Sequence, residues 1–201
     1  MRIAIIGAGN VGGGLGTALA AAGHEIVFGV RDPDSDKTRV ALDTARASSA
    51  ADPAVAVDGA DVVVFALRWD VVPDTVTGLP SLAGRIVIDA MNRVAGPAHA
   101  PSATEDLAGL LPGAKLVKCF NTIGFENLTT ARDRSVRAAM FAAGDDPEAK
   151  RVALDLAAQI GFDAHDAGPL ANAKVLEDMV KVWFALTQAH GRRVGFAVSP
   201  G

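Results

Sequence analysis

Short continuous runs of apolar residues alternate along the chain with stretches in which apolar residues recur at helical spacing. The continuous runs are rich in valine, isoleucine and alanine and predict strands. We expect strands at residues 2–6, 25–30, 54–57, 61–67, 85–89, 114–119, 138–143 and 162–165. We expect helices at residues 11–22, 38–49, 147–160 and 172–190, and an exposed loop at residues 97–101.

This alternation predicts an α/β fold. Strands that are apolar at nearly every position are typical of a parallel sheet that helices cover on both faces. We therefore expect a Rossmann-type, doubly wound, mainly parallel sheet. The length of 201 residues suits one domain with a substantial core. We expect residues 1–201 to form that single domain, with residues 172–190 as a short C-terminal helical appendage.

The composition narrows the class of protein. Hydrophobic residues make up 50% of the chain, charged residues 21%, and the net charge is −4, so nothing favours nucleic acid as a partner. A single cysteine excludes an internal disulfide framework and fits a reducing compartment. The apolar runs are shorter than the ~18 residues of a membrane span, and a predicted strand starts at residue 2 with no signal-peptide region before it. We expect a cytoplasmic protein without a membrane partner.

Three glycines spaced Gly-x-Gly-x-x-Gly separate the first predicted strand from the first predicted helix. Gly7 permits a tight turn, Gly9 lets the backbone approach phosphates, and Gly12 lets the helix pack closely on the strand. The start of the helix adds unpaired N–H groups and the positive end of its dipole. Such a pattern is weak evidence alone, and a structural turn is its alternative, but this strand–helix context favours a dinucleotide. The predicted pyrophosphate site comprises Gly7, Ala8, Gly9, Asn10, Val11 and Gly12.

The segment after the second predicted strand indicates which dinucleotide is bound. NAD sites place an acidic side chain here, whereas NADP sites place an arginine on the 2′-phosphate. Arg31 follows the strand, and its guanidinium suits a phosphate. Three aspartates between residues 32 and 36 weigh against this reading unless their side chains point to solvent, and a charged surface turn is the alternative. We predict NADP. Candidate second contacts are Ser35, Lys37, Thr38 and Arg39.

Several segments carry a more specific likeness. They are residues 7–12, 29–31 (Gly-Val-Arg), 117–124 (Val-Lys-Cys-Phe-Asn-Thr-Ile-Gly), 143–146 (Ala-Gly-Asp-Asp) and 166–170 (Asp-Ala-Gly-Pro-Leu). In this order they resemble the NADPH-dependent coenzyme F420 reductases and the related cytosolic reductase domain of the STEAP metalloreductases. The resemblance implies NADP(H) on a Rossmann domain and hydride transfer to a deazaflavin or flavin, with coenzyme F420 leading and FMN or FAD as substitutes. Arg31 matches that family's 2′-phosphate arginine, although the preceding serine or threonine is Val30 here.

The segments that follow the strong predicted strands would meet at one edge of the sheet, where doubly wound folds bind ligands. Asn121 and Thr122 could bind the nicotinamide amide or the acceptor ring, and Asn92 the nicotinamide ribose. The alternative is that the asparagines satisfy loop backbone. Trp69 offers a plane to a ligand, with core or dimer packing as its alternative. The cofactor-binding candidates at this edge are Leu67, Arg68, Asn92, Asn121 and Thr122.

Hydride transfer between two ring cofactors requires alignment and exclusion of water rather than an acid or base. We therefore assign no catalytic residue and no metal ligand. The histidines at positions 24, 99, 165 and 190 are scattered and show no ligand spacing. We interpret Cys119 as a small buried hydrophobe rather than a redox thiol.

Two other functions remain open. One is a non-catalytic NADP(H)-binding regulatory module. The other is a small NADP-dependent imine or carbonyl reductase, which would need an acid or base. Lys174 and His165 are the candidates for that role, and the residues after 166 are too few for a large helical second domain.

We predict two binding surfaces, a basic rim for the acceptor and an apolar face on the last predicted helix. Coenzyme F420 carries a phosphate and an acidic tail, so its site should have a basic rim. The available residues are Arg68, Arg93, Lys118, Arg132, Arg134 and Arg137. The last helix is amphipathic and would pack on the domain or on a second copy, which leads us to expect a homodimer. Its apolar positions are Val175, Leu176, Met179, Val182, Trp183 and Leu186.

Overall fold

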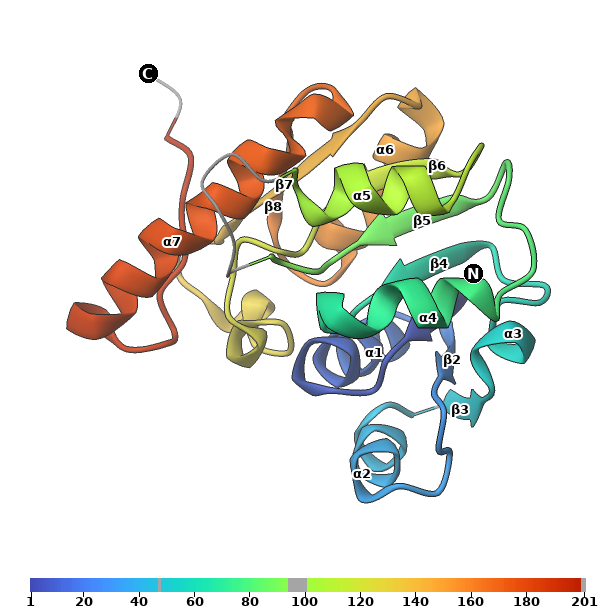
Figure 1. Cartoon of the computed structure of the whole chain (residues 1–201). Coiled ribbons are helices and arrows are strands. Elements are labelled where there is room, and N and C mark those ends of the chain that lie inside the picture. Colours follow the sequence, from blue (N-terminus) through green and yellow to red (C-terminus); the bar gives the residue numbers. More distant parts are fainter. Residues whose placement is uncertain (47, 94–100, 200–201) are drawn as a thin grey trace.

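A computed structural model of the chain describes residues 1–46, 48–93 and 101–199. Within these residues, eight strands form one sheet in the order β3-β2-β1-β4-β5-β6-β7-β8 (Figure 1). The strands are β1 (Arg2–Ile6), β2 (Glu25–Gly29), β3 (Ser48–Ala51), β4 (Val62–Phe65), β5 (Ile86–Asp89), β6 (Lys115–Lys118), β7 (Ala139–Gly144) and β8 (Asp163–Asp166). Neighbouring strands run parallel except β6 and β7, which are antiparallel. The expected mainly parallel, doubly wound sheet is confirmed.

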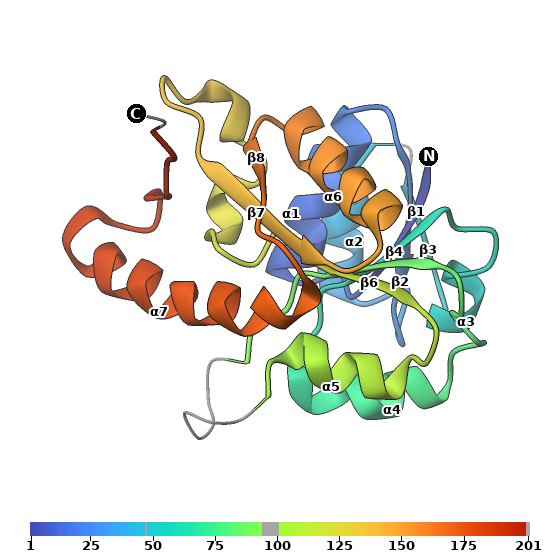
Figure 2. The ribbon, with the colours of Figure 1, turned by 90° about the horizontal axis from the view of Figure 1, so that it is seen from above.

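Helices cover both faces of the sheet, as Figure 2 shows from above. The helices are α1 (Asn10–Ala21), α2 (Asp36–Thr44), α3 (Pro53–Ala56), α4 (Val72–Thr77), α5 (Ala103–Leu110), α6 (Pro147–Gln159) and α7 (Ala173–His190). Alternate side chains of β1 enter two separate cores. Ile3 and Ile5 belong to the core under α1, α2 and α6, and Ala4 and Ile6 to the core under α3, α4 and α5. Complete burial of one such isoleucine contributes roughly 1.5–3 kcal/mol, which explains why these strands are apolar on both sides.

The region between α2 and β4 differs from the sequence expectation. Residues 54–57 were predicted as a strand but lie largely in α3, where Pro53 occupies the first turn and the Asp52 side chain accepts a hydrogen bond from the Ala54 N–H. The third strand lies instead at Ser48–Ala51, and it overlaps the end of the helix that was predicted over residues 38–49. Proline and a capping aspartate favour a helix start over a strand interior, and this local signal outweighs the apolar run. Helices α4 and α5 were not expected at all, and residues 97–100 of the predicted loop lie outside the described residues.

The chain after α7 folds back on the domain. The Trp183 indole N–H donates to the carbonyl oxygen of Val194 at 2.9 Å, and the Ala139 N–H donates to that of Phe196 at 2.8 Å. This segment therefore packs against α7 and the start of β7. None of the helices in the described ranges combines the length and the apolar character that a membrane crossing requires.

Candidate functional site

The glycine loop between β1 and α1 has the geometry that its three glycines predict. Gly7 has a φ of +108°, in the left-handed region, and a Cβ there would lie 2.7 Å from the Ala66 carbonyl oxygen. A Cβ on Gly12 would lie 1.9 Å from the carbonyl oxygen of Gly7, so the helix approaches the strand more closely than any side chain allows. A Cβ on Gly9 would meet nothing within 4 Å. The space above Gly9 is therefore open, as a site for a phosphate group requires.

The start of α1 offers unpaired hydrogen-bond donors to that space. Gly9 is the N-cap residue, and no side chain caps the helix. The Gly13 N–H makes the first bond of the helix, to the carbonyl oxygen of Gly9 at 2.7 Å. The N–H groups of Asn10, Val11 and Gly12 precede this bond and have no acceptor within the helix. Together with the helix dipole they form an anion site, so the loop fits a dinucleotide pyrophosphate.

Arg31 follows β2 at the same edge of the sheet and is exposed. Among the described residues, no ion pair involves it. The neighbouring aspartates at positions 32, 34 and 36 are exposed as well, and Asp36 pairs with Arg39. These carboxylates point to solvent, which is the condition under which Arg31 can serve as a phosphate ligand.

The candidate second contacts near Arg31 differ in their accessibility. Ser35 caps α2, and its Oγ accepts a hydrogen bond from the Thr38 N–H at 3.4 Å. Thr38 is buried, and its hydroxyl donates to the Asp32 carbonyl oxygen at 3.0 Å. Lys37 is exposed. Thr38 therefore supports the turn, whereas Ser35 and Lys37 remain accessible.

Asn92 and Asn121 meet where β5 and β6 end. The Asn92 Nδ2 donates to the Asn121 carbonyl oxygen, and the Asn121 Nδ2 donates to Asn92 Oδ1 and to the Leu176 carbonyl oxygen of α7, each at 2.9 Å. Asn121 Oδ1 and Thr122 Oγ1 are buried and have no hydrogen-bond partner among the described residues. A buried polar atom without a partner costs about 1–3 kcal/mol. These two atoms therefore mark a place where a polar ligand would be bound, and they suit a carboxamide or ribose group.

Phe120, just before this pair, adopts an unusual backbone conformation. Its φ is +63°, which is rare for a bulky residue, and its side chain is 2% exposed. Strained residues of this kind persist where the surrounding structure holds them, and they cluster at functional sites. The turn at Phe120 directs the chain from β6 to Asn121 and Thr122.

Polar side chains from the end of β4 complete the rim. Arg68 is exposed and bonds Asp70, with its Nε 3.0 Å from Asp70 Oδ1. This hydrogen bond raises the pKa of Arg68 and lowers that of Asp70. Trp69 is half-buried beneath the guanidinium of Arg93, which lies 4.5 Å from the ring centre. Trp69 thus packs against Arg93 on one face, and Leu67 reaches the glycine loop, where its Cδ2 lies 2.9 Å from the place of a Cβ on Gly7.

The structure does not bring all six basic residues of the expected rim together at the strand-end site. Lys118 is completely buried and is no part of a surface. Arg132 donates to the Gln159 carbonyl oxygen at the end of α6 and packs against Gly161, so its guanidinium is engaged there. Arg134 bonds Asn127 and the backbone of the C-terminal segment. Arg137 is exposed just before β7, with no ion pair among the described residues. Arg68 and Arg93 are the members of the set that follow β4 and β5 at the strand-end site.

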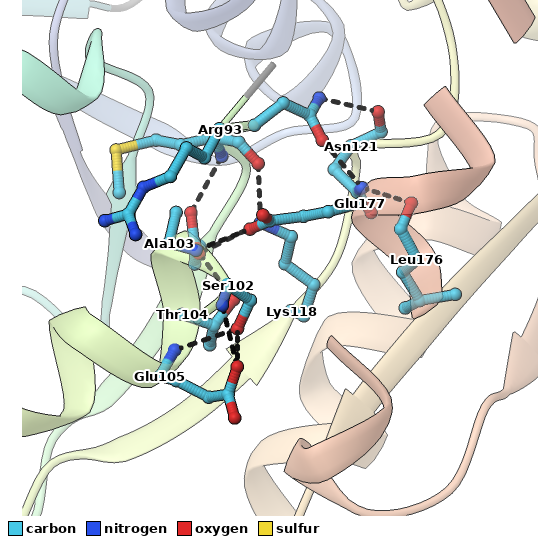
Figure 3. A network of polar contacts seen from close by, with 12 residues as sticks. Arg93, Ser102, Ala103, Thr104, Glu105, Lys118, Asn121, Leu176 and Glu177 are labelled. Atoms are coloured by element: carbon cyan, nitrogen blue, oxygen red, sulfur yellow. Dashed lines mark hydrogen bonds and ion pairs between the residues drawn. The ribbon is translucent and has the colours of Figure 1, made fainter. Parts of the chain in front are cut away.

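Lys118 belongs to a buried ionic network that the sequence reasoning missed (Figure 3). Its Nζ donates to Asp89 Oδ2 at 3.0 Å, to Glu177 Oε1 at 2.7 Å and to the Met91 carbonyl oxygen at 2.6 Å. Thr104 of α5 donates its hydroxyl to Asp89 Oδ2 at 2.6 Å. The available signal was a charged residue at the last position of two apolar strands, Asp89 and Lys118, which are direct partners in the sheet.

The cysteine, the histidines and Lys174 were the remaining candidates for a chemical role, and the contacts among the described residues give them structural roles. Burial raises the pKa of the Cys119 thiol to about 12, in keeping with a small buried hydrophobe. His24 bonds Gln159 and His165 bonds Asp163, whereas His99 lies outside the described residues. Lys174 donates to Asp178 one turn further along α7. This pairing holds Lys174 on its own helix.

Comparisons with known proteins agree with this geometry. Residues 2–93 match the family described as NADP oxidoreductase, coenzyme F420-dependent. A putative F420-dependent NADP reductase from Arthrobacter sp. FB24 superposes with a TM-score of 0.88 and 27% identity, over 100% of both chains. Metalloreductase STEAP3 of Rattus norvegicus is 30% identical over 178 residues, which are 88% of this chain and 36% of that protein, so the chain spans about a third of its length. A reductive aminase from Aspergillus terreus shares the fold alone, with a TM-score of 0.69 and 18% identity, over 94% of this chain and 62% of that one.

Proposed function

The chain belongs to the family described as NADP oxidoreductase, coenzyme F420-dependent, and on that premise we propose that it transfers hydride between NADPH and a deazaflavin acceptor. Coenzyme F420 is the proposed acceptor, with FMN or FAD as substitutes. With any of these acceptors, the activity is that of an NADP-dependent oxidoreductase. The acceptor ring would dock at the open edge of the sheet, over the nicotinamide.

One observation carries this proposal. Asn121 Oδ1 and Thr122 Oγ1 are buried and have no hydrogen-bond partner among the described residues, and they follow β6 at the same edge of the sheet as the open phosphate loop after β1. This edge therefore offers polar atoms to a ring amide or ribose. The pyrophosphate would lie on the start of α1, and Arg31 would bind the 2′-phosphate. The bound dinucleotide would supply the hydride, while these residues orient it and exclude water.

The rim also supports an anionic acceptor. Arg93 lies over Trp69, donates to the Pro101 carbonyl oxygen at 3.0 Å and forms an ion pair with Asp106 of α5, which partly neutralises it. Arg68 is exposed beside it and is partly neutralised by Asp70. The smaller basic rim formed by Arg68 and Arg93 would receive the phosphate and acidic tail of coenzyme F420.

A steady-state acceptor screen tests the proposal. NADPH and NADH are offered side by side with coenzyme F420, FMN and FAD, and their oxidation is followed by absorbance. We expect turnover with NADPH and coenzyme F420, and slower turnover with the flavins. Tight NADPH binding without turnover on any of the three acceptors would refute the proposal and favour a non-catalytic NADP(H)-binding module.

The imine or carbonyl reductase remains a second reading that the same assays separate. Lys174 pairs with Asp178 on its own helix, and among the described residues it makes no hydrogen bond or ion pair with Asn121. Lys174→Met should therefore leave flavin or deazaflavin reduction largely intact. Loss of all turnover in Lys174→Met would instead favour the imine or carbonyl reductase.

We further propose a cytoplasmic homodimer that associates through α7. Val175 and Val182 are 60% and 53% exposed, and Met179 and Leu186, on the same flank, are half-buried. A helix flank of this kind is typical of an interface. Light scattering should give the mass of two chains, and the variant with Val175 and Val182 both changed to Glu should give that of one. A wild-type mass of one chain would exclude the dimer.

A further inference from the structure

Three ionisable side chains are buried together directly behind the strand-end site. Lys118 and Asp89 are completely buried and Glu177 is 6% exposed. Burying charges is costly, and replacing a buried ion pair by apolar residues of similar volume often stabilises a protein. A hydride transfer does not require these groups as acids or bases. Their presence therefore calls for another explanation.

The backbone connects these charges to the residues that would hold the nicotinamide. Lys118 donates to the carbonyl oxygen of Met91, the residue before Asn92. Glu177 follows Leu176, whose carbonyl oxygen accepts from Asn121. Figure 3 shows Glu177 and Lys118 beside Asn121 and the start of α7. The buried triad of Asp89, Lys118 and Glu177 thus supports the pair of asparagines from behind.

Glu177 also holds the start of α5. Its Oε1 accepts a hydrogen bond from the Ala103 N–H at 2.9 Å, at the positive end of that helix. The same oxygen accepts from Lys118. Glu177 therefore joins α7 to α5 and β6, although its position in the sequence lies far from both.

The triad carries one excess negative charge, because two carboxylates surround one ammonium group. A charge in the interior acts over a longer range than one in water, and salt screens it less. The nicotinamide ring is positively charged when oxidised and neutral when reduced. A fixed negative charge behind the ring would favour the oxidised form, which arises when the hydride leaves for the acceptor ring.

We infer that the Asp89–Lys118–Glu177 triad biases the nicotinamide site toward NADP⁺, with Glu177 as the positioning residue that supplies the excess charge. This inference rests on the proposed position of the nicotinamide beside Asn121 and Thr122. A purely structural triad would change the affinity for both forms of the cofactor alike. An electrostatic role changes their ratio.

The test measures the dissociation constants of NADPH and NADP⁺ separately by calorimetry, in the full chain without an acceptor. Glu177→Gln keeps the shape of the side chain and removes its charge. We expect the ratio of the NADP⁺ constant to the NADPH constant to rise by about threefold or more. The rise should persist in 0.3 M salt, which screens surface charges to within roughly 6 Å.

Asp178→Asn is the matched control. It removes the same charge from the next residue of α7, where Asp178 is half-exposed and paired with Lys174 and Lys181. Its ratio should stay at the wild-type value. Asp89→Asn is the second variant if Glu177→Gln does not fold, and it should shift the ratio in the same direction.

The outcomes are distinct. An unchanged ratio in a folded Glu177→Gln or Asp89→Asn protein that still binds NADPH would overturn the inference and leave the proposed function intact. An equal shift in Asp178→Asn would overturn it as well, because an exposed charge would then act as strongly as the buried one. Failure of the wild type to bind either dinucleotide would overturn both proposals.

Discussion

Replacing Thr122 by valine should stabilise the protein without its cofactor and weaken its binding of NADPH. Thr122 is 1% exposed, and its Oγ1 has no hydrogen-bond partner among the described residues. Valine has nearly the same shape and removes a buried polar group whose isolation costs about 1–3 kcal/mol. We expect the free energy of unfolding to rise by about 1 kcal/mol, which corresponds to roughly 2–4 °C in Tm for a chain of this size.

Thr104→Val is the matched control, because both threonines are buried and only their partners differ. The Thr104 hydroxyl donates to Asp89 Oδ2 at 2.6 Å. A hydrogen bond to a charged group contributes about 1.5–3 kcal/mol, so Thr104→Val should lower the free energy of unfolding by about 2 kcal/mol. Opposite signs for the two variants are therefore expected in urea unfolding of the protein without ligand.

The same variants separate stability from binding. Loss of the Thr122 hydroxyl should raise the dissociation constant of NADPH by about tenfold, because one hydrogen bond to the cofactor disappears. Fluorescence titration measures this constant. If Thr122→Val is destabilised like Thr104→Val, or if it binds NADPH as tightly as the wild type, the interpretation of Thr122 as a ligand contact is wrong.

Four further outcomes follow from single residues. Arg31→Ala should raise KM for NADPH about 10- to 100-fold in steady-state assays and leave KM for NADH nearly unchanged, since a charged hydrogen bond to the 2′-phosphate is lost. Gly12→Ala should lower the free energy of unfolding by about 3 kcal/mol, because its Cβ would lie 1.9 Å from a backbone oxygen; a wild-type urea midpoint would contradict this. Cys119 should react with a thiol reagent at pH 8 only after denaturation, since burial raises its pKa to about 12; fast labelling of the native protein would count against it. A hydrogen bond from Lys150 lowers the pKa of Asp166. The pair therefore stabilises the protein at a pH above the ordinary aspartate pKa, and this stabilisation is lost as the pH falls through the lowered pKa of Asp166. Lys150→Met should accordingly lower Tm at pH 7 and lower it by less at pH 3.

Much of the fold was accessible from local patterns. The apolar runs at residues 2–6 and 61–67 mark β1 and β4, because a strand buried on both faces must be apolar at successive positions. The third strand was misplaced where two local signals competed. Small residues at 48–51 pair with β2 at the edge of the sheet, a tertiary contact, whereas the Asp-Pro start of α3 is a local signal that the apolar run obscured.

In the candidate site, too, some roles could be predicted from local sequence and others depend on distant residues. Gly7, Gly9 and Gly12 could be assigned roles from their spacing, since each role depends on atoms within a few residues or on the adjacent strand. Lys118 was expected on a basic rim because coenzyme F420 carries a phosphate and an acidic tail, and lysine is rarely fully buried unless it is paired. Its burial depends on Glu177, which lies 59 residues further along the chain.

The sequence by itself determined the α/β alternation, the phosphate loop and the arginine after β2, because these features depend on short-range sterics and on the charge of single residues. Only the tertiary structure decided which polar residues meet at the ends of β5 and β6. Asn92, Asn121 and the Leu176 carbonyl are joined by hydrogen bonds over 29 and 55 residues, and Asp89, Lys118 and Glu177 by ion pairs over comparable separations. Such contacts arise from the order of the strands and the docking of α7, and no local pattern encodes them.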